Sequence, residues 1–325
     1  MKEIVSGMRH LPIYKKALVI FGLVLVAISA VFPVFYRIRA ASELSLNNER
    51  FLEERKLDYH VLMAELQGQA AKFKGDAGIL VKDISTGESI SMNSSKLFPS
   101  ASLVKLPIMA AVYQAELEGR LQLTDKLVLK RSHKVRDCSK LYFKRNGTKY
   151  EINDLIVRMI TESDNTASNM LVEALGFGYI NQKFVEFGLK DTDLRRGIMD
   201  LKWRRAGIEN YTTVEDMAYL LEKIYNRELV STAASDRMMA VLKKQKVNDR
   251  IPRKLPDETI VAHKTGSLRD TISDCGIVFT QKGDFIVCVI TADIKNYRTA
   301  KRFIADIAAC AYDKCYNKKT EMPAL

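Results

Sequence analysis

The stretch Phe98-Pro-Ser-Ala-Ser-Leu-Val-Lys-Leu-Pro-Ile-Met-Ala-Ala-Val112 combines a helical pattern with a serine and a lysine three positions apart. Apolar residues recur in it at helical spacing, which predicts a helix starting near Ser102. Pro107 is the weak point of this prediction, because beyond the first turn a proline removes a backbone hydrogen bond and kinks a helix. Ser102 and Lys105 would then lie on one face.

This serine and lysine are suited to nucleophilic chemistry. A serine hydroxyl becomes a strong nucleophile only when a neighbouring base takes its proton, and a lysine amine does so once burial or nearby positive charge lowers its pKa. The unpaired amides at a helix N-terminus would also favour negative charge developing at Ser102. The alternative is that Ser102 caps the helix and Lys105 is solvated, since a single Ser-x-x-Lys match also arises by chance.

Two later motifs favour the nucleophilic role of Ser102 over the capping role. Ser163-Asp-Asn165 follows an amphipathic run, and Lys264-Thr-Gly-Ser267 closes the strand-like run 259–263. Ser-x-x-Lys, Ser-Asp-Asn and Lys-Thr-Gly in this order are the signature of class A β-lactamases and penicillin-binding proteins. The chain resembles this superfamily of active-site serine acyl enzymes, most closely the class A side, over about residues 62–316. Asp164 is expected to point inward and hold its turn.

The resemblance implies a role for each matched residue. Ser102 would be the nucleophile that forms an acyl-enzyme, with Lys105 as its base or proton relay. Ser163 would pass a proton to the departing nitrogen, and Asn165 would hydrogen-bond the substrate amide. Lys264 would keep Lys105 deprotonated and attract a substrate carboxylate.

The Lys-Thr-Gly segment is expected to bind substrate. Thr265 would hydrogen-bond the substrate carboxylate, and Gly266 would let an extended peptide or a β-lactam amide lie against the strand. The resemblance also implies an oxyanion hole made by the backbone amides of Ser102 and Ser267. The alternative for this segment is an ordinary edge strand ending in a turn. His263 should face the other way along the strand and pack in the interior.

The sequence departs from the class A pattern in one loop. In class A β-lactamases a glutamate after the Ser-Asp-Asn element activates the deacylating water, but the stretch Leu194–Thr213 has no glutamate at the expected place. Asp200 is the nearest acid and Glu209 lies further on, so either is a candidate deacylation acid. A carboxylate displaced by about an ångström can lose around 100-fold in rate. Acylation is therefore expected to survive better than deacylation.

Strand and helix patterns predict an α+β fold. Strand signals occur in two early runs and three late ones, around a mainly helical middle from 102 to about 244 with a hairpin or loop excursion at 127–152. These runs are 77–84, 89–92, 259–265, 276–280 and 285–291, and a closing helix follows at 296–316. We expect a β-lactamase/D,D-peptidase-like fold, with an antiparallel five-stranded sheet flanked by helices and an inserted helical lobe.

The N-terminal region predicts a membrane anchor. Residues 17–36 carry no charge and are just long enough to cross the hydrocarbon core, and basic residues are more frequent before than after them. The predicted organisation is a cytoplasmic tail (1–16), a transmembrane anchor (17–36), a juxtamembrane stalk (37–60) and an extracytoplasmic hydrolase domain (61–325). A cleaved signal peptide is the rival interpretation.

Composition limits the partners. The net charge of +12 has no accompanying nucleic-acid motif, so attraction to anionic lipid headgroups or cell-wall polymers is favoured over a nucleic-acid partner. No His/Cys cluster has metal-ligand spacing, and we expect neither a metal nor another cofactor. Cys275 and Cys288 lie beside apolar runs and are expected to be buried. The oligomeric state stays open.

Three functions are compatible with these sequence features. The first is an extracytoplasmic serine hydrolase of the class A β-lactamase-like kind, acylated at Ser102 by β-lactams or cell-wall peptide amides. The second is a penicillin-binding D,D-carboxypeptidase or transpeptidase acting on peptidoglycan stem peptides, favoured by the missing glutamate. The third is a non-catalytic sensor of β-lactams or the cell wall, although residues 1–16 contain no visible signalling domain.

Overall fold

The computed structural model describes residues 12–136 and 139–316, apart from some side chains within the first helix and those of residues 315 and 316. The chain divides into two units, Met1–Leu57 and Asp58–Leu325. The helix α2 (Ile13–Lys72) runs from the first unit into the second. The sheet, the remaining helices and all predicted site residues belong to the second unit.

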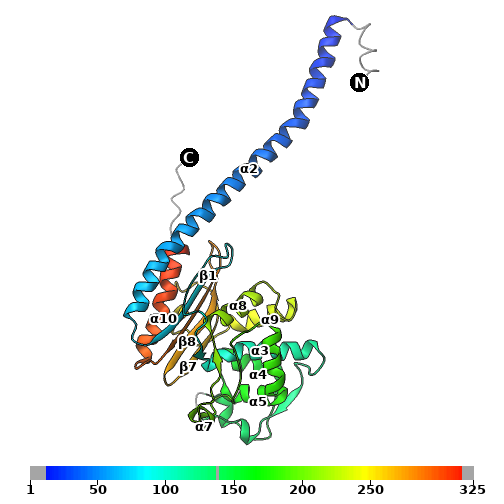
Figure 1. Ribbon diagram of the computed structural model, residues 1–325. Coiled ribbons are helices and arrows are strands. Elements are labelled where there is room, and N and C mark those ends of the chain that lie inside the picture. Colours follow the sequence, from blue (N-terminus) through cyan, green and yellow to red (C-terminus); the bar gives the residue numbers. More distant parts are fainter. Residues whose placement is uncertain (1–11, 137–138, 317–325) are drawn as a thin grey trace. The chain divides into compact units, whose positions relative to one another are not determined.

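A five-stranded antiparallel sheet forms the centre of the second unit, in the order β2-β1-β9-β8-β7 (Figure 1). Two strands come from the start of the unit and three from its end, as predicted. They are β1 (Asp76–Asp83), β2 (Ser89–Met92), β7 (Val261–Leu268), β8 (Thr271–Val278) and β9 (Phe285–Ala292). The predicted α+β class is confirmed.

Helices cover both faces of the sheet. Side chains alternate between the two faces along each strand, so neighbouring residues of one strand pack in different apolar clusters. Ile79 and Val81 of β1 pack in one apolar cluster with Leu62 of α2 and Ile304 of α10 (Tyr297–Ala311). Leu80, between them, packs in a second cluster with the inserted lobe. The sheet is therefore the middle layer between two helical layers.

The inserted lobe between β2 and β7 is mainly helical, as expected. Its helices are α3 (Lys105–Leu117), α4 (Ile152–Thr161), α5 (Asn165–Leu175), α6 (Phe177–Glu186), α7 (Leu201–Arg205), α8 (Val214–Tyr225) and α9 (Thr232–Leu242). Two short ribbons complete it: β3 (Phe98–Pro99) pairs with β6 (Tyr211–Thr212), and β4 (Lys126–Val128) pairs with β5 (Lys149–Glu151). The second ribbon accounts for the excursion predicted at 127–152.

One predicted strand start was wrong, and two predicted helices change their helix type along their length. The α-helix α3 begins at Lys105, after a 3₁₀ turn (Ala101–Val104), so Pro107 falls in its first turn, where its missing N–H costs little. Strand β8 begins at Thr271 rather than at 276, because residues 271–275 are buried and pair with β7 instead of forming a loop. Helix α10 ends at Ala311, and a π-helical turn (Tyr312–Tyr316) follows.

The predicted membrane span at 17–36 forms part of α2. Within the described part of the chain, no helix is both long enough and apolar enough to cross a bilayer. Many side chains between residues 19 and 31 lie outside the described residues, as does the predicted tail up to residue 11. The tail, anchor and stalk stay predictions from the sequence.

Candidate active site

Ser102 lies in the 3₁₀ turn that leads into the buried helix α3. The preceding ribbon holds this turn, since Phe98 pairs with Thr212 and the Ser100 amide donates to the Asn210 carbonyl at 2.8 Å. Ala101 has a left-handed backbone with φ of 47°, a conformation that costs energy and clusters at functional sites. Ser102 is half-buried at the start of a rigid core helix.

Lys105 is fully buried and not solvated. Its Nζ donates to the Ser163 carbonyl oxygen at 2.7 Å and to Asn165 Oδ1 at 2.5 Å, with a longer bond of 3.3 Å to Ser163 Oγ. The structure therefore rules out the interpretation of a surface lysine, and it joins the first predicted motif to the second.

Ser163 lies in the turn between α4 and α5 and also has a left-handed backbone, with φ of 55°. Asp164 caps α5 and points inward as predicted, where its carboxylate accepts from Ser139 Oγ at 2.6 Å and from the amides of Leu141 and Ala167 at 3.2 and 2.9 Å. These bonds fix the turn, and with it the direction of the Ser163 hydroxyl.

Lys264 completes the group from strand β7. Its Nζ, also fully buried, donates to Ser163 Oγ at 3.0 Å and to the Thr265 carbonyl at 2.7 Å. The Ser163 hydroxyl thus accepts from two lysines that lie far apart in the sequence. Thr265 is buried and pairs in register with Asp274 on the neighbouring strand.

Gly266 brings β7 against the Ser102 turn. A Cβ atom at this glycine would lie 2.3 Å from Ser273 Oγ, 3.1 Å from Ala101 Cβ and 3.3 Å from the Ser102 amide nitrogen. The prediction was that glycine here leaves room for substrate. On the side where a Cβ would project, the structure shows that protein atoms fill the space and that close strand packing requires the glycine.

A small cavity of about 30 Å³ lies beside Ser102. Three predicted site residues line it, namely Ser102, Asn165 and the exposed Ser267, together with residues that no sequence motif indicated. The full lining is Ala101, Ser102, Asn165, Arg196, Ile198, Met199, Asn210, Ser267 and Leu268. A volume of this order is enough for about one water molecule.

Arg196 is the unexpected member of this lining. It is 4% exposed, and its guanidinium donates from Nη2 to Glu209 Oε1 and from Nη1 to the Gly197 carbonyl at 3.2 Å. Its buried Nε has no hydrogen-bond partner among the described residues. A basic residue therefore lines the cavity from the loop in which a carboxylate was expected.

Neither candidate acid lines this cavity. Asp200 caps α7, where its Oδ1 accepts from the amides of Lys202 and Trp203 at 3.2 and 3.3 Å, and it lines a different cavity of about 530 Å³. Glu209 is buried in ion pairs with Arg196 and Arg204. Among the described residues no carboxylate lines the cavity at Ser102, and the geometry gives no support to Asp200 as the deacylation acid.

Arg250 is a second residue without a sequence signal. It is 2% exposed, and its guanidinium donates to Ser267 Oγ at 2.6 Å and to the Ser273 carbonyl at 3.3 Å. Burial lowers the pKa of Arg250 from its usual high value, although Asp274 and Asp249 oppose this. Its contact with Ser267 places a guanidinium beside the segment expected to bind a substrate carboxylate.

His263 behaves as expected of a packing residue. It is 1% exposed, and its Nδ1 lies 2.9 Å from Asp274 Oδ1, while Nε2 lies 3.1 Å from Asn248 Oδ1. Asp274 also accepts from the Ile251 amide at 3.1 Å. The histidine therefore belongs to a buried polar network beneath the strand.

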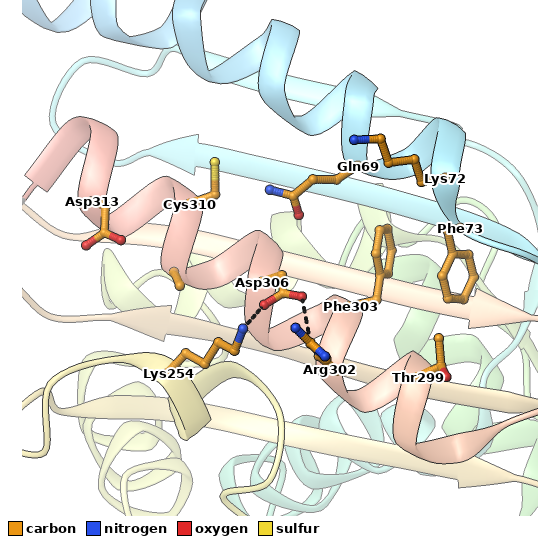
Figure 2. A pocket seen from close by; sticks show the side chains of 11 residues that line it. Gln69, Lys72, Phe73, Lys254, Thr299, Arg302, Phe303, Asp306, Cys310 and Asp313 are labelled. Carbon is orange, nitrogen blue, oxygen red and sulfur yellow. Dashed lines mark hydrogen bonds and ion pairs between the residues drawn. The ribbon is translucent and has the colours of Figure 1, made fainter.

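A cavity of about 820 Å³ lies elsewhere, between the end of α2 and α10 (Figure 2). Phe73 stacks on Phe303 there with ring centroids 4.3 Å apart. Lys254 and Arg302 both pair with Asp306, as the dashed lines in Figure 2 show. None of the serines and lysines predicted for catalysis lines this cavity.

Comparisons with known proteins agree with this geometry. The beta-lactamase enzyme family matches residues 61–315. Beta-lactamase VEB-1 of Pseudomonas aeruginosa is 26% identical over 258 residues, which covers 74% of this chain and 86% of that protein. A β-lactamase structure from Sphaerobacter thermophilus is 28% identical with a TM-score of 0.73, covering 79% of this chain and 98% of the other.

A second solved structure is a mutant of PBP-A as its acyl-enzyme complex with penicillin G. It is 27% identical with a TM-score of 0.73, covering 78% of this chain and 96% of the other. The family match spans the whole region that contains the sheet, the inserted lobe and the three motifs. The chain therefore belongs to the beta-lactamase enzyme family, as the order of its Ser-x-x-Lys, Ser-Asp-Asn and Lys-Thr-Gly motifs indicated.

Proposed function

We propose that this chain is a serine enzyme that β-lactams or cell-wall peptide amides acylate at Ser102, and that its acyl-enzyme turns over slowly. The observation that carries the proposal is the Ser163 hydroxyl, which accepts from both Lys105 and Lys264 beside a cavity that Ser102 lines. Lys105 is fully buried within this group, and in the proposed reaction it accepts the Ser102 proton.

The acylation step follows from this arrangement. The Ser102 oxygen forms a bond to the substrate carbonyl carbon, and its proton passes to Lys105. The C–N bond then breaks, and the departing nitrogen takes a proton through the Ser163 hydroxyl. Arg250, which donates to Ser267, would hold a substrate carboxylate together with Lys264. Asn165, which also lines the cavity, would orient the substrate amide.

Deacylation lacks an evident base. Arg196 is the charged residue that lines the cavity at Ser102, and a guanidinium cannot accept a proton at working pH. Hydrolysis of the ester therefore has to proceed without the activation that a carboxylate supplies, and the acyl-enzyme should persist.

The same observation favours a second candidate. A penicillin-binding D,D-carboxypeptidase or transpeptidase would also be acylated by β-lactams and would also release them slowly. The similarity to PBP-A, solved as a penicillin G acyl-enzyme, fits this candidate. For either candidate we propose an extracytoplasmic location, which rests on the apolar stretch 17–36 and the basic residues before it.

The test is labelling with a fluorescent penicillin, followed by intact mass over time. We expect a covalent adduct on the wild type and none on Ser102→Ala. Ser235→Ala is a matched control, because Ser235 is a fully buried serine in α9 whose hydroxyl donates only locally, to the Leu229 carbonyl. A persistent adduct supports slow turnover, rapid loss of the adduct supports an efficient β-lactamase, and equal labelling of Ser102→Ala refutes the proposal.

A further inference from the structure

Helix α7 (Leu201–Arg205) has no buried residue, although it follows directly on the wall of the Ser102 cavity. Leu201 is 47% exposed and Trp203 is 50% exposed. Figure 1 shows α7 as a short helix at the edge of the helical lobe. Because burial of apolar side chains normally fixes a helix in place, the position of α7 must depend on other contacts.

Arg204 makes these contacts. Its Nε donates to Glu209 Oε2 at 2.6 Å, and its Nη2 donates to both carboxylate oxygens of Asp270 at 2.8 and 2.9 Å. Asp270 lies in the turn between β7 and β8, two residues after Leu268, which also lines the cavity. The Arg204–Asp270 ion pair therefore joins α7, which follows Met199, to the turn that follows Leu268, and both of these residues line the Ser102 cavity.

The residues that face Ser102 are held separately from α7. The Ile198 amide donates to Asn169 Oδ1 at 3.0 Å, and the Arg196 amide donates to Asn210 Oδ1 at 2.9 Å. Left-handed residues flank α7 on both sides, Met199 with φ of 61° and Gly207 with φ of 84°. The amide contacts of 196 and 198 do not involve Arg204 or any other residue of α7.

We infer that the Arg204–Asp270 pair is a latch that holds α7 against the β7–β8 turn and so limits the size of the acyl group that reaches Ser102. The inference rests on the proposed function for its substrate. A cavity of about 30 Å³ admits no bulky group unless its two walls separate, and this pair joins them. Asp270 and Arg204 are positioning residues, since neither lines the cavity.

The charge state of the latch is consistent with this role. Partial burial raises the pKa of Asp270, but the hydrogen bonds and positive charge of Arg204, together with the hydrogen bond from Thr271, hold the pKa below its usual value. Asp270 is therefore a carboxylate at neutral pH, and the pair is ionic.

The test compares Asp270→Asn with Asp270→Glu, which keeps the charge. Glu116→Gln is a matched control, because Glu116 forms a comparable two-point pair with Arg237, away from the site. The first measurement is acrylamide quenching of Trp203, the sole tryptophan of the chain. Since Trp203 is already half-exposed, we expect Asp270→Asn to raise the quenching constant by up to about twofold.

The second measurement is the acylation rate for benzylpenicillin and for methicillin, which share a nucleus and differ only in the acyl group. We expect Asp270→Asn to raise the methicillin-to-benzylpenicillin rate ratio by about tenfold, while Asp270→Glu and Glu116→Gln keep the wild-type ratio. An unchanged ratio, with or without a change in quenching, would overturn the inference. If neither penicillin acylates the wild type, the proposed function fails, and unchanged quenching would then separately refute the latch.

Discussion

Gly266→Ala tests whether close packing of β7 against the Ser102 turn sets the nucleophile. The new Cβ would lie 2.3 Å from Ser273 Oγ and 3.1 Å from Ala101 Cβ, so the strand or the turn must shift. Overpacking of this kind costs about 1–3 kcal/mol of unfolding free energy. A shift of the Ser102 turn by about an ångström would also lower the acylation rate by about 100-fold.

The two effects can be separated with Ser273→Ala. The Ser273 hydroxyl is buried and has no hydrogen-bond partner among the described residues, so its removal should cost little stability. In the double variant the worst clash is absent, and we expect at least about 1 kcal/mol of the lost stability to return. The Ala101 contact remains, so acylation should stay slow.

The measurements are urea unfolding and the rate of labelling by a fluorescent penicillin. Gly178→Ala is the control, because a Cβ at Gly178 in α6 meets no atom within 4 Å, and it should be neutral or stabilising by about 0.5–1 kcal/mol. Wild-type labelling and stability in Gly266→Ala would refute the reasoning. If the effects of Gly266→Ala and Ser273→Ala on the unfolding free energy were strictly additive, the contact between the new Cβ and Ser273 Oγ would not be the cause of the lost stability.

Three further predictions concern single side chains. Ser163→Ala should lower the acylation rate, measured by fluorescent-penicillin labelling, by about 100-fold, and labelling at the wild-type rate would contradict the proton path. Asp200→Asn should leave the lifetime of the penicillin adduct, measured by intact mass, unchanged, whereas a longer lifetime would restore Asp200 as the deacylation acid. Glu118 accepts from Lys183, which lowers the pKa of Glu118 to about 2, so its stabilising effect is present above pH 4.5 and is lost as the pH falls toward 2. Because Glu118 lies near the surface, Glu118→Gln should cost only about 1 kcal/mol at pH 7, and urea unfolding should show this cost shrinking below pH 4.5; a cost independent of pH would contradict the ion pair.

The sequence predicted those parts of the site that local motifs encode. Ser102, Lys105, Ser163 and Lys264 each belong to a short motif with a recognisable order, and the structure brings the last three onto one hydroxyl group. Continuous apolar runs likewise located β1 and β9, because residues on both faces of these strands are buried.

The missed features depend on contacts between distant segments. Arg196 and Arg250 look like ordinary basic residues in the sequence, and only the fold places them beside the site. The start of β8 was missed because Asp274 and Ser273 are polar, and their burial depends on His263 and Arg250 from other elements. Local periodicity carries no information about such pairs.

The position of β9 has a consequence for biosynthesis. It is the last strand to leave the ribosome, yet it lies between β1 and β8 and pairs with both. Until residue 292 has emerged, the nascent chain exposes two unpaired strand edges, which favour self-association. A premature stop codon before Phe285 should thus yield an aggregating or rapidly degraded fragment, although every one of its catalytic motifs would already have been translated.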